Sequence, residues 1–253
     1  MLLNHRVLGQ GPPLLILHGL FGSLDNWMTL AKQLASDYTV YLVDLRNHGQ
    51  SFHHSQFNYT VMAEDIQKLV EDLELSDIFL LGHSLGGKTA MFFTAHNESL
   101  VSILIVVDIS PKYYPNRQLL ILDALNAIDM NTLTSRREAD DILSRYISEE
   151  GIRLFLMKNL KRKSADSFDW KINLPVLNEQ IDQVGEALPS SVMVQVPTLF
   201  IRGGASDYIS DEDQQGILAQ FPNSNIHTIP GAGHWVHAEA PQELLETVKE
   251  FLG

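Results

Sequence analysis

The fold is decided by the stretch Gly82-His83-Ser84-Leu85-Gly86-Gly87, which follows the apolar run 78–81 (IFLL) and precedes a helical pattern that starts at Lys88. A G-x-S-x-G pattern between a strand and a helix is typical of a nucleophile elbow, in which the serine hydroxyl points out of the sheet. The flanking glycines leave room for the sharp turn, and the N–H groups that begin the helix favour negative charge beside the hydroxyl. The pattern predicts that Ser84 is a nucleophile. The alternative is an ordinary serine in a Gly-rich turn.

Short, continuous apolar runs recur on both sides of this stretch, with helical patterns between them. Continuous apolar runs indicate strands of a parallel sheet that is covered on both faces. Apolar residues spaced as on one helical face occur in 59–73 and again after Pro241. This alternation of strands and helices predicts an α/β fold. The predicted strands are 13–17 (PLLIL), 39–43 (TVYLV), 78–81 (IFLL), 103–107 (ILIVV), 198–201 (TLFI) and 226–229 (IHTI).

The alternation is interrupted once, between about residues 110 and 190, where only helical patterns rich in charge occur. This segment holds 11 of the 18 basic residues and 12 of the 31 acidic ones, so it is nearly neutral while the remainder is strongly acidic. We interpret 110–190 as an all-helical cap inserted into a core formed by 1–109 and 191–253. The alternative is that these are ordinary helices of the layers beside the sheet.

Composition excludes several classes of function. With 253 residues the chain has the length of one large domain, or of one domain with an insertion. It has no Cys, which excludes disulfides, Cys-ligated zinc, iron–sulfur clusters and thiol catalysis. The net charge of −13 argues against nucleic acid and anionic membranes as partners. Residues 1–13 lack the features of a signal peptide, and no apolar run is long enough to cross a bilayer, so we expect a soluble, cytoplasmic protein.

A serine nucleophile needs a base, and His234 is the best placed of the ten histidines. It lies in 230–237 (PGAGHWVH), after the last predicted strand and before the last helix. A Gly-rich loop at this point can carry an imidazole over the edge of the sheet. His237 is the nearest rival, and we interpret it as a structural residue at the start of the final helix.

An acid should orient the imidazole, and two aspartates are candidates. Asp207 follows the predicted strand 198–201, and Asp108 follows the predicted strand 103–107. Both stand at the carboxyl side of the sheet, where open α/β sheets bind their ligands. The alternative for either is an aspartate that caps a loop.

The anion that forms during acyl transfer also needs hydrogen-bond donors. The stretch 18–23 (HGLFGS) follows the first strong predicted strand, and the small residue Gly19 lets the backbone approach the site. We therefore predict that the N–H groups of Leu20 and Leu85 form the oxyanion hole.

Taken together, HG near the N-terminus, DLRNHGQS at 44–51, GHSLGG at 82–87, DISP at 108–111 and GAGHWVHAEAP at 231–241 resemble the α/β-hydrolase superfamily. The combination is most similar to the small bacterial YbfF-type esterases. That resemblance implies an eight-stranded, mostly parallel sheet, a helical cap between strands six and seven, and no metal or organic cofactor. Most of the superfamily takes its acid from the position of Asp207, whereas the closer group takes it from the position of Asp108. The resemblance therefore favours Asp108.

The function we expect is that of a serine carboxylesterase, which hydrolyses small acyl esters through an acyl-enzyme intermediate on Ser84; acyl-CoA thioesters are a second candidate class of substrate. The alternatives on the same three residues are a perhydrolase or haloperoxidase-like reaction and C–C bond hydrolysis. A ligand-sensing receptor of the same fold is a further alternative. The expected partner is a small-molecule substrate, and the expected assembly is a monomer or homodimer.

The predicted cap should roof the site. We expect Phe155 and Trp170 to line an acyl pocket and Tyr113 to border its entrance; the alternative is that such residues pack within the cap. A basic cluster that includes Lys161 and Arg162 could meet the phosphates of an acyl-CoA. The alternative for this cluster is a solvated helix end.

Overall fold

The computed structural model describes residues 1–164 and 167–253, and its centre is a seven-stranded sheet in the order β1-β3-β2-β4-β5-β8-β9. Strand β1 is antiparallel to β3, and every other neighbouring pair is parallel. The carboxyl ends of the parallel strands therefore meet at one edge of the sheet. The strands are β1 (His5–Leu8), β2 (Pro13–Leu17), β3 (Thr39–Val43), β4 (Ile78–His83), β5 (Val101–Val107), β8 (Thr198–Gly203) and β9 (Ser224–Ile229).

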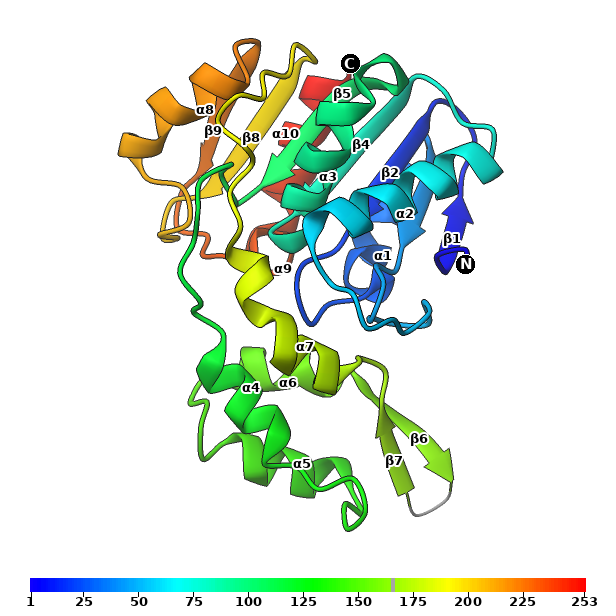
Figure 1. The fold of residues 1–253 in the computed structure, drawn as a ribbon, viewed down its shortest axis with the longest axis vertical. Helices are drawn as coiled ribbons and strands as arrows, with labels where there is room; N and C mark the ends of the chain where they lie inside the picture. The colour runs from blue at the N-terminus through cyan, green and yellow to red at the C-terminus, as the bar shows by residue number, and fades with distance from the viewer. Residues whose placement is uncertain (165–166) are drawn as a thin grey trace.

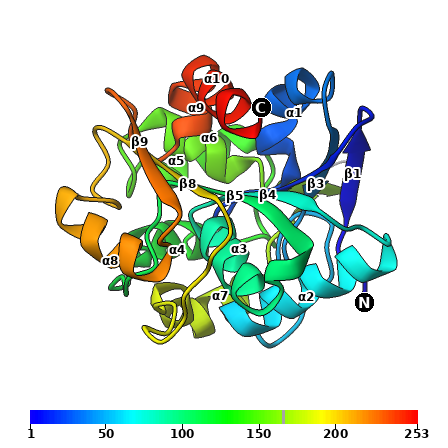
Figure 2. The ribbon, with the colours of Figure 1, turned by 90° about the horizontal axis from the view of Figure 1, so that it is seen from above.

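Helices cover both faces of this sheet, as Figure 2 shows. On one face lie α1 (Met28–Leu34), α9 (Val236–Glu239) and α10 (Pro241–Leu252). On the other lie α2 (Tyr59–Asp72), α3 (Leu85–His96) and α8 (Gln214–Gln220). Each face of the sheet has its own buried apolar cluster. Four short 3₁₀ helices complete the described core and cap: Leu24–Trp27, Glu98–Leu100, Ile181–Gly185 and Asp211–Asp213.

The α/β prediction is confirmed, but the described sheet has seven strands and not the eight that the resemblance implied. Six of the seven coincide with the predicted apolar runs. The seventh, β1, pairs only with β3 at the edge of the sheet, and two of its four residues are exposed. A short edge strand of this kind carries no continuous apolar run, which is why the sequence pattern did not reveal it.

Residues 110–190, which we interpret as a cap, leave the sheet after β5 and return to it before β8, between the fifth and sixth strands of the described sheet. Figure 1 shows their elements below the core, beyond the ends of the parallel strands. The cap is not all helical, which corrects the prediction. Its elements are α4 (Leu119–Asn126), α5 (Arg136–Leu143), α6 (Glu150–Met157), the strands β6 (Leu160–Ser164) and β7 (Ser167–Trp170), and α7 (Leu174–Gln180).

The basic cluster that includes Lys161 and Arg162 lies on β6, which pairs with β7. It is therefore part of a β-hairpin and not a helix end. Lys161 faces Asp169 across the antiparallel pair, and the last four residues of β6 are exposed. On β7 exposure alternates, so Phe168 and Trp170 turn inward and pack in the same apolar cluster as α2 and α3. The period of two that marks a strand is carried by four residues only, too few to stand out in the sequence.

A buried lysine ties both ends of the cap to the core. The ammonium group of Lys88, on α3, is completely buried. It donates to the carbonyl oxygen of Lys112 (2.7 Å), where the chain enters the cap, and to that of Glu186, where the chain leaves it. The ammonium also lies 4.9 Å from the ring centre of Tyr114.

Two asparagines add further links between cap and core. Nδ2 of Asn159 donates to the carbonyl oxygen of Phe21 (2.7 Å), in the loop after β2. The N–H of Asn173 donates to the carbonyl oxygen of Asn47 (2.9 Å). Since these links reach the loops at the carboxyl edge of the sheet, the cap is held directly over that edge.

The helices of residues 1–164 and 167–253 include none with the combined length and apolar character needed to span a bilayer.

Candidate active site

The turn between β4 and α3 presents the hydroxyl of Ser84 at the carboxyl edge of the sheet. Ser84 has φ 51° and ψ −116°, a backbone conformation that residues other than glycine rarely adopt. The turn closes because its flanking glycines lack side chains. A Cβ at Gly82 would lie 2.2 Å from the carbonyl oxygen of Gly86, and one at Gly86 would lie 2.4 Å from that of Leu17.

A chain of hydrogen bonds joins three of the predicted residues. Nε2 of His234 lies 3.0 Å from Oγ of Ser84, and Nδ1 of His234 lies 2.8 Å from Oδ2 of Asp108. A carboxylate only accepts, so Nδ1 carries the proton and Nε2 is free to take the one on the hydroxyl. This is the relation of nucleophile, base and orienting acid that acyl-transfer enzymes use.

Asp108 is buried at the end of β5 and has two partners besides His234. The N–H of Gly203 donates to Oδ1 (2.9 Å), and the hydroxyl of Ser206 donates to Oδ2. The residue itself has φ 49°, in the left-handed region that aspartate tolerates better than most residues. Its carboxylate is thus held in one orientation by a donor at the end of β8 and a donor on the loop that follows.

The structure does not bring Asp207 to His234. The Asp207 side chain is 76% exposed and pairs with Arg117, with Nη1 and Oδ2 2.7 Å apart. Its neighbour Ser206 instead contacts Asp108. The loop after β8 therefore supplies a donor for the buried carboxylate rather than a second carboxylate for the histidine.

Leu20 and Leu85, whose N–H groups the sequence predicted as donors of an oxyanion hole, line the same space as Ser84. Leu85 is the first residue of α3, so its N–H has no acceptor within the helix. Among the described residues, no acceptor pairs with the N–H of Leu20 either. Gly19 allows the approach of this loop, because a Cβ there would lie 2.8 Å from Nδ1 of His83 and 3.4 Å from Cβ of Ser84.

Buried neutral histidines and one aspartate hold the loop that carries Leu20. His48 accepts at Nε2 from the N–H of Phe21 (3.2 Å), and burial lowers the pKa of His48 to about 3. His18 accepts at Nε2 from the N–H of Leu45 (3.1 Å), and burial lowers its pKa as well. Asp44 accepts from the N–H of Leu24 (2.8 Å).

Three contacts at or near His234 were not predicted from the sequence. The ring of Tyr208 stacks on the imidazole, with ring centres 3.8 Å apart and planes 15° apart. Nε2 of His83 donates to the carbonyl oxygen of His234 (2.8 Å), and burial lowers the pKa of His83 well below its usual value, so this imidazole is neutral. His237 stacks on Trp27 (4.8 Å between centres). Only the adjacency of these residues to the motifs could have indicated them.

Glu239 fixes the loop on which His234 lies. Its carboxylate accepts from the N–H of Gly233 (2.7 Å) and from the N–H of Trp235 (3.2 Å), one on each side of the histidine.

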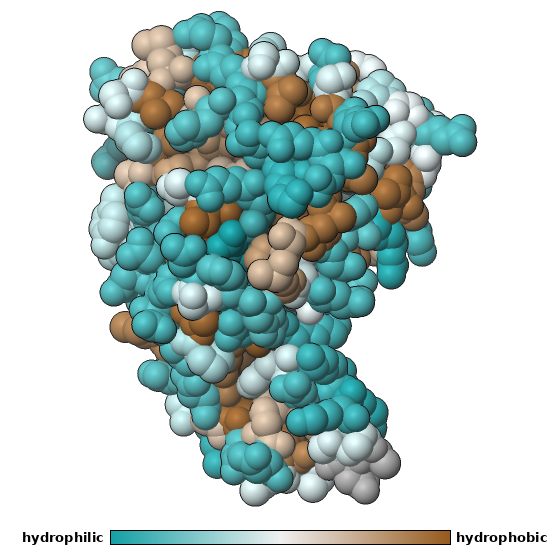
Figure 3. Space-filling model, turned by 45° about the vertical axis from the view of Figure 1, so that its right-hand side comes forward, coloured by the Kyte–Doolittle hydropathy of each residue, from teal (hydrophilic) through white to brown (hydrophobic). Residues whose placement is uncertain are grey.

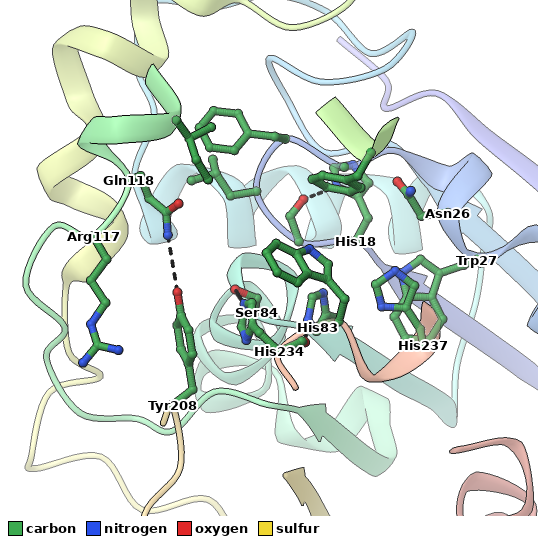
Figure 4. Close-up of a pocket in the computed structure, with 17 residues that line it drawn as sticks. His18, Asn26, Trp27, His83, Ser84, Arg117, Gln118, Tyr208, His234 and His237 are labelled. Carbon is green, nitrogen blue, oxygen red and sulfur yellow. Dashed lines mark hydrogen bonds between the residues drawn. The ribbon is translucent and has the colours of Figure 1, made fainter. Parts of the chain in front are cut away.

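A pocket of about 270 Å³ opens over Ser84 and His234, as Figure 4 shows. Arg117, Gln118 and Tyr208 lie on one side of these two residues, and Asn26, Trp27 and His237 lie on the other. Phe155, on α6, also lines this pocket.

The other predicted substrate contacts lie elsewhere and are corrected. Trp170 is buried inside the cap, where it packs in the apolar cluster. Tyr113 is 63% exposed and does not line the pocket. Lys161 and Arg162 lie on β6, where Lys161 is 3.6 Å from the carboxylate of Asp169 and Arg162 lies over the ring of Phe168. The hairpin carries these cations away from Ser84, which no helical interpretation of the segment could foresee.

A serine between a parallel strand and a helix, hydrogen-bonded to a histidine that contacts a buried aspartate, is the arrangement that serine hydrolases of the α/β type use. The comparison with protein families agrees, because residues 12–139 match the model described as the alpha/beta hydrolase fold. The chain belongs to the alpha/beta hydrolase fold family, which confirms the resemblance seen in the sequence.

Three similar proteins, two curated relatives and one solved structure, indicate which kind of hydrolase this chain is. The chain is 37% identical to esterase YbfF of Escherichia coli over 95% of its own length and 92% of that protein. It is 37% identical to the sn-1-specific diacylglycerol lipase ABHD11 of Mus musculus over 95% of its own length and 81% of that protein. A solved structure titled "Marine microorganism esterase" superposes with a TM-score of 0.96 at 41% identity, covering 99% of each chain. The chain is thus a carboxylic ester hydrolase.

Proposed function

We propose that the chain hydrolyses small acyl esters by two-step acyl transfer, with Ser84 as nucleophile, His234 as base and Asp108 as the orienting acid. The observation that carries this proposal is the continuous chain of hydrogen bonds from Asp108 through His234 to Ser84. The N–H groups of Leu20 and Leu85 are the proposed donors to the oxyanion.

In the first step, Oγ of Ser84 forms a bond to the carbonyl carbon while its proton moves to Nε2 of His234. The bond to the alcohol oxygen then breaks, and that oxygen leaves with the proton from Nε2. Water, activated by the same imidazole, releases the acid from Ser84. The buried carboxylate of Asp108 stabilises the imidazolium that forms in each half of the reaction, because unlike charges attract strongly where water is excluded.

The cap, residues 110–190, is proposed to roof this site on the core of residues 1–109 and 191–253. Phe155 supports the proposal, since it reaches from α6 to the pocket over Ser84. We do not extend the proposal to acyl-CoA thioesters, because the cations expected to meet the CoA phosphates lie on β6 and not around the pocket.

The test is Ser84→Ala, assayed with p-nitrophenyl butyrate. Loss of the nucleophile should lower kcat roughly 10⁶-fold and leave a residual catalysis of roughly 10³–10⁴ over the uncatalysed reaction. Where deacylation is the slower step, the wild type should also release a rapid burst of about one p-nitrophenol per chain before the steady state. Retention of the wild-type rate by Ser84→Ala would contradict the proposal.

A further inference from the structure

Two apolar spaces of very different size adjoin the pocket of about 270 Å³ over Ser84. On the side of Gln118 and Tyr208, a chamber of about 40 Å³ borders Ser84 and is lined by Leu85, Tyr114 and Val184. On the side of Asn26 and His237, a groove of about 750 Å³ opens between the cap and the core. Figure 4 shows that these two sides are opposite one another across Ser84 and His234.

The groove is continuous with the catalytic pocket. Asn26, Phe155, Trp235 and His237 line both spaces. Beyond them the groove runs between α6 of the cap and the region of α1, α9 and the start of α10 in the core. Its further apolar lining residues are Leu30, Ile152, Leu154, Ala238 and Pro241, and three charged residues line it as well: Glu149, Lys158 and Glu239.

The groove keeps large apolar side chains in contact with solvent. Leu154 is 52% exposed, and Phe155 and Trp235 are partly exposed. Figure 3 shows a face of the molecule on which hydrophobic patches lie between mostly hydrophilic residues. An apolar groove that leads to a nucleophile fits a hydrocarbon chain of the substrate.

The chemistry of the proposed function decides which arm of the ester enters the groove. His234 must give its proton to the oxygen of the departing alcohol, so that alcohol lies against the imidazole. His234 lines the pocket that continues into the groove, and it does not line the small chamber. The acyl carbon is bonded to Ser84, so the acyl chain is assigned to the chamber beside Leu85, which Ser84 also lines.

We propose that the groove binds the alcohol arm of the ester and the small chamber its acyl group, so the preferred substrates are short-chain acyl esters of long-chain, apolar alcohols. The chamber has room for only a few non-hydrogen atoms. This inference rests on the proposed function and adds to it the orientation and class of the substrate.

Two isomeric esters separate the arms without a difference in overall hydrophobicity. Octyl butyrate carries its long chain on the alcohol, and butyl octanoate carries it on the acid. The readout is the ratio of kcat/KM for octyl butyrate to that for butyl octanoate, measured by acid release. The wild type should give a ratio above one.

The chain offers matched pairs of variants. A Cβ at Gly151, which lines the groove on α6, meets no atom within 4 Å, and the same is true of Gly216 on α8. Gly151→Trp therefore fills the groove, and Gly216→Trp is its control. Leu154→Glu makes the groove polar at a half-exposed position, and Leu218→Glu, at a residue 42% exposed on α8, is its control.

Each methylene that loses burial weakens binding about fourfold. If two or three methylenes are displaced, Gly151→Trp lowers the ratio roughly 15- to 60-fold. Leu154→Glu should lower it as well, and both controls should keep the wild-type ratio. Leu154→Glu decides the question if Gly151→Trp does not fold.

A ratio that rises in the two groove variants would mean that the acyl chain occupies the groove, and an unchanged ratio would mean that neither arm does. Either result overturns the inference. Failure of the proposed function looks different, because Ser84→Ala would then hydrolyse both esters at the wild-type rate.

Discussion

Lys88 provides a quantitative test of how the cap is held on the core. Burial lowers the pKa of Lys88 from 10.5 to about 7, since the ammonium lies beneath the cap linkers with Lys112 nearby, while Glu186 opposes the shift. Between pH 7 and 10.5 the unfolded chain therefore binds a proton that the folded chain has released, so stability rises with pH in that window.

The magnitude follows from linkage. One proton gives a slope of roughly 1.4 kcal/mol per pH unit, or about 2–3 kcal/mol between pH 7.5 and 9.5. Lys88→Met removes this contribution and leaves all others. The difference in unfolding free energy, wild type minus Lys88→Met, should therefore increase with pH by that amount. Burial raises the pKa values of Tyr59 and Tyr114, so neither ring titrates in the window.

The assay is urea unfolding of wild type and Lys88→Met at about pH 7.5, 8.5 and 9.5, within the range where linkage predicts the slope. Lys32→Met, at an exposed lysine on α1, is the control and should show no such slope. A difference that stays constant or falls as the pH rises would refute the reasoning, because it would mean that the carbonyl acceptors outweigh the cost of burying the charge.

Three further predictions concern the site and its supports. Burial lowers the pKa of His237 from 6.5 to about 4, so stability falls as the pH drops through this range; in urea unfolding, wild type minus His237→Phe should lose roughly 2–3 kcal/mol between pH 6.5 and 4. Ser206→Ala removes a donor to Asp108 and should lower kcat roughly tenfold with little change in KM, and Ser206→Thr should restore it; equal loss in both variants argues against the hydrogen bond. Asn159→Ala leaves the carbonyl of Phe21 without this partner and should cost about 1–3 kcal/mol of unfolding free energy, whereas an unchanged urea midpoint would rule out a stabilising role.

The elements that could be predicted are those whose pattern is local. The parallel strands are continuous apolar runs, and the elbow is a fixed spacing of glycines around Ser84 that only one turn satisfies. Strand β1 and the β6–β7 hairpin were missed because their stability comes from partners elsewhere: β1 from pairing with β3, and β7 from packing Phe168 into the apolar cluster.

The site shows the same limit. Ser84 and His234 lie in recognisable motifs. Which of Asp108 and Asp207 contacts His234 depends instead on how the ends of β5 and β8 are placed in the folded chain. Their spacing from the predicted strands does not decide between the two aspartates, since each follows the end of a strand. The contact of Ser206 with Asp108 is a product of tertiary structure, with no signal in the sequence beyond its place beside Asp207.

The central claim is that Asp108, and not Asp207, orients His234. The most direct measurement is kcat for p-nitrophenyl butyrate with Asp108→Asn and Asp207→Asn. The account predicts a loss of about 10³–10⁴ for Asp108→Asn, because an amide in that place favours the wrong tautomer of the imidazole, and a change of less than about threefold for Asp207→Asn. A large loss in Asp207→Asn with Asp108→Asn near the wild-type rate would contradict it.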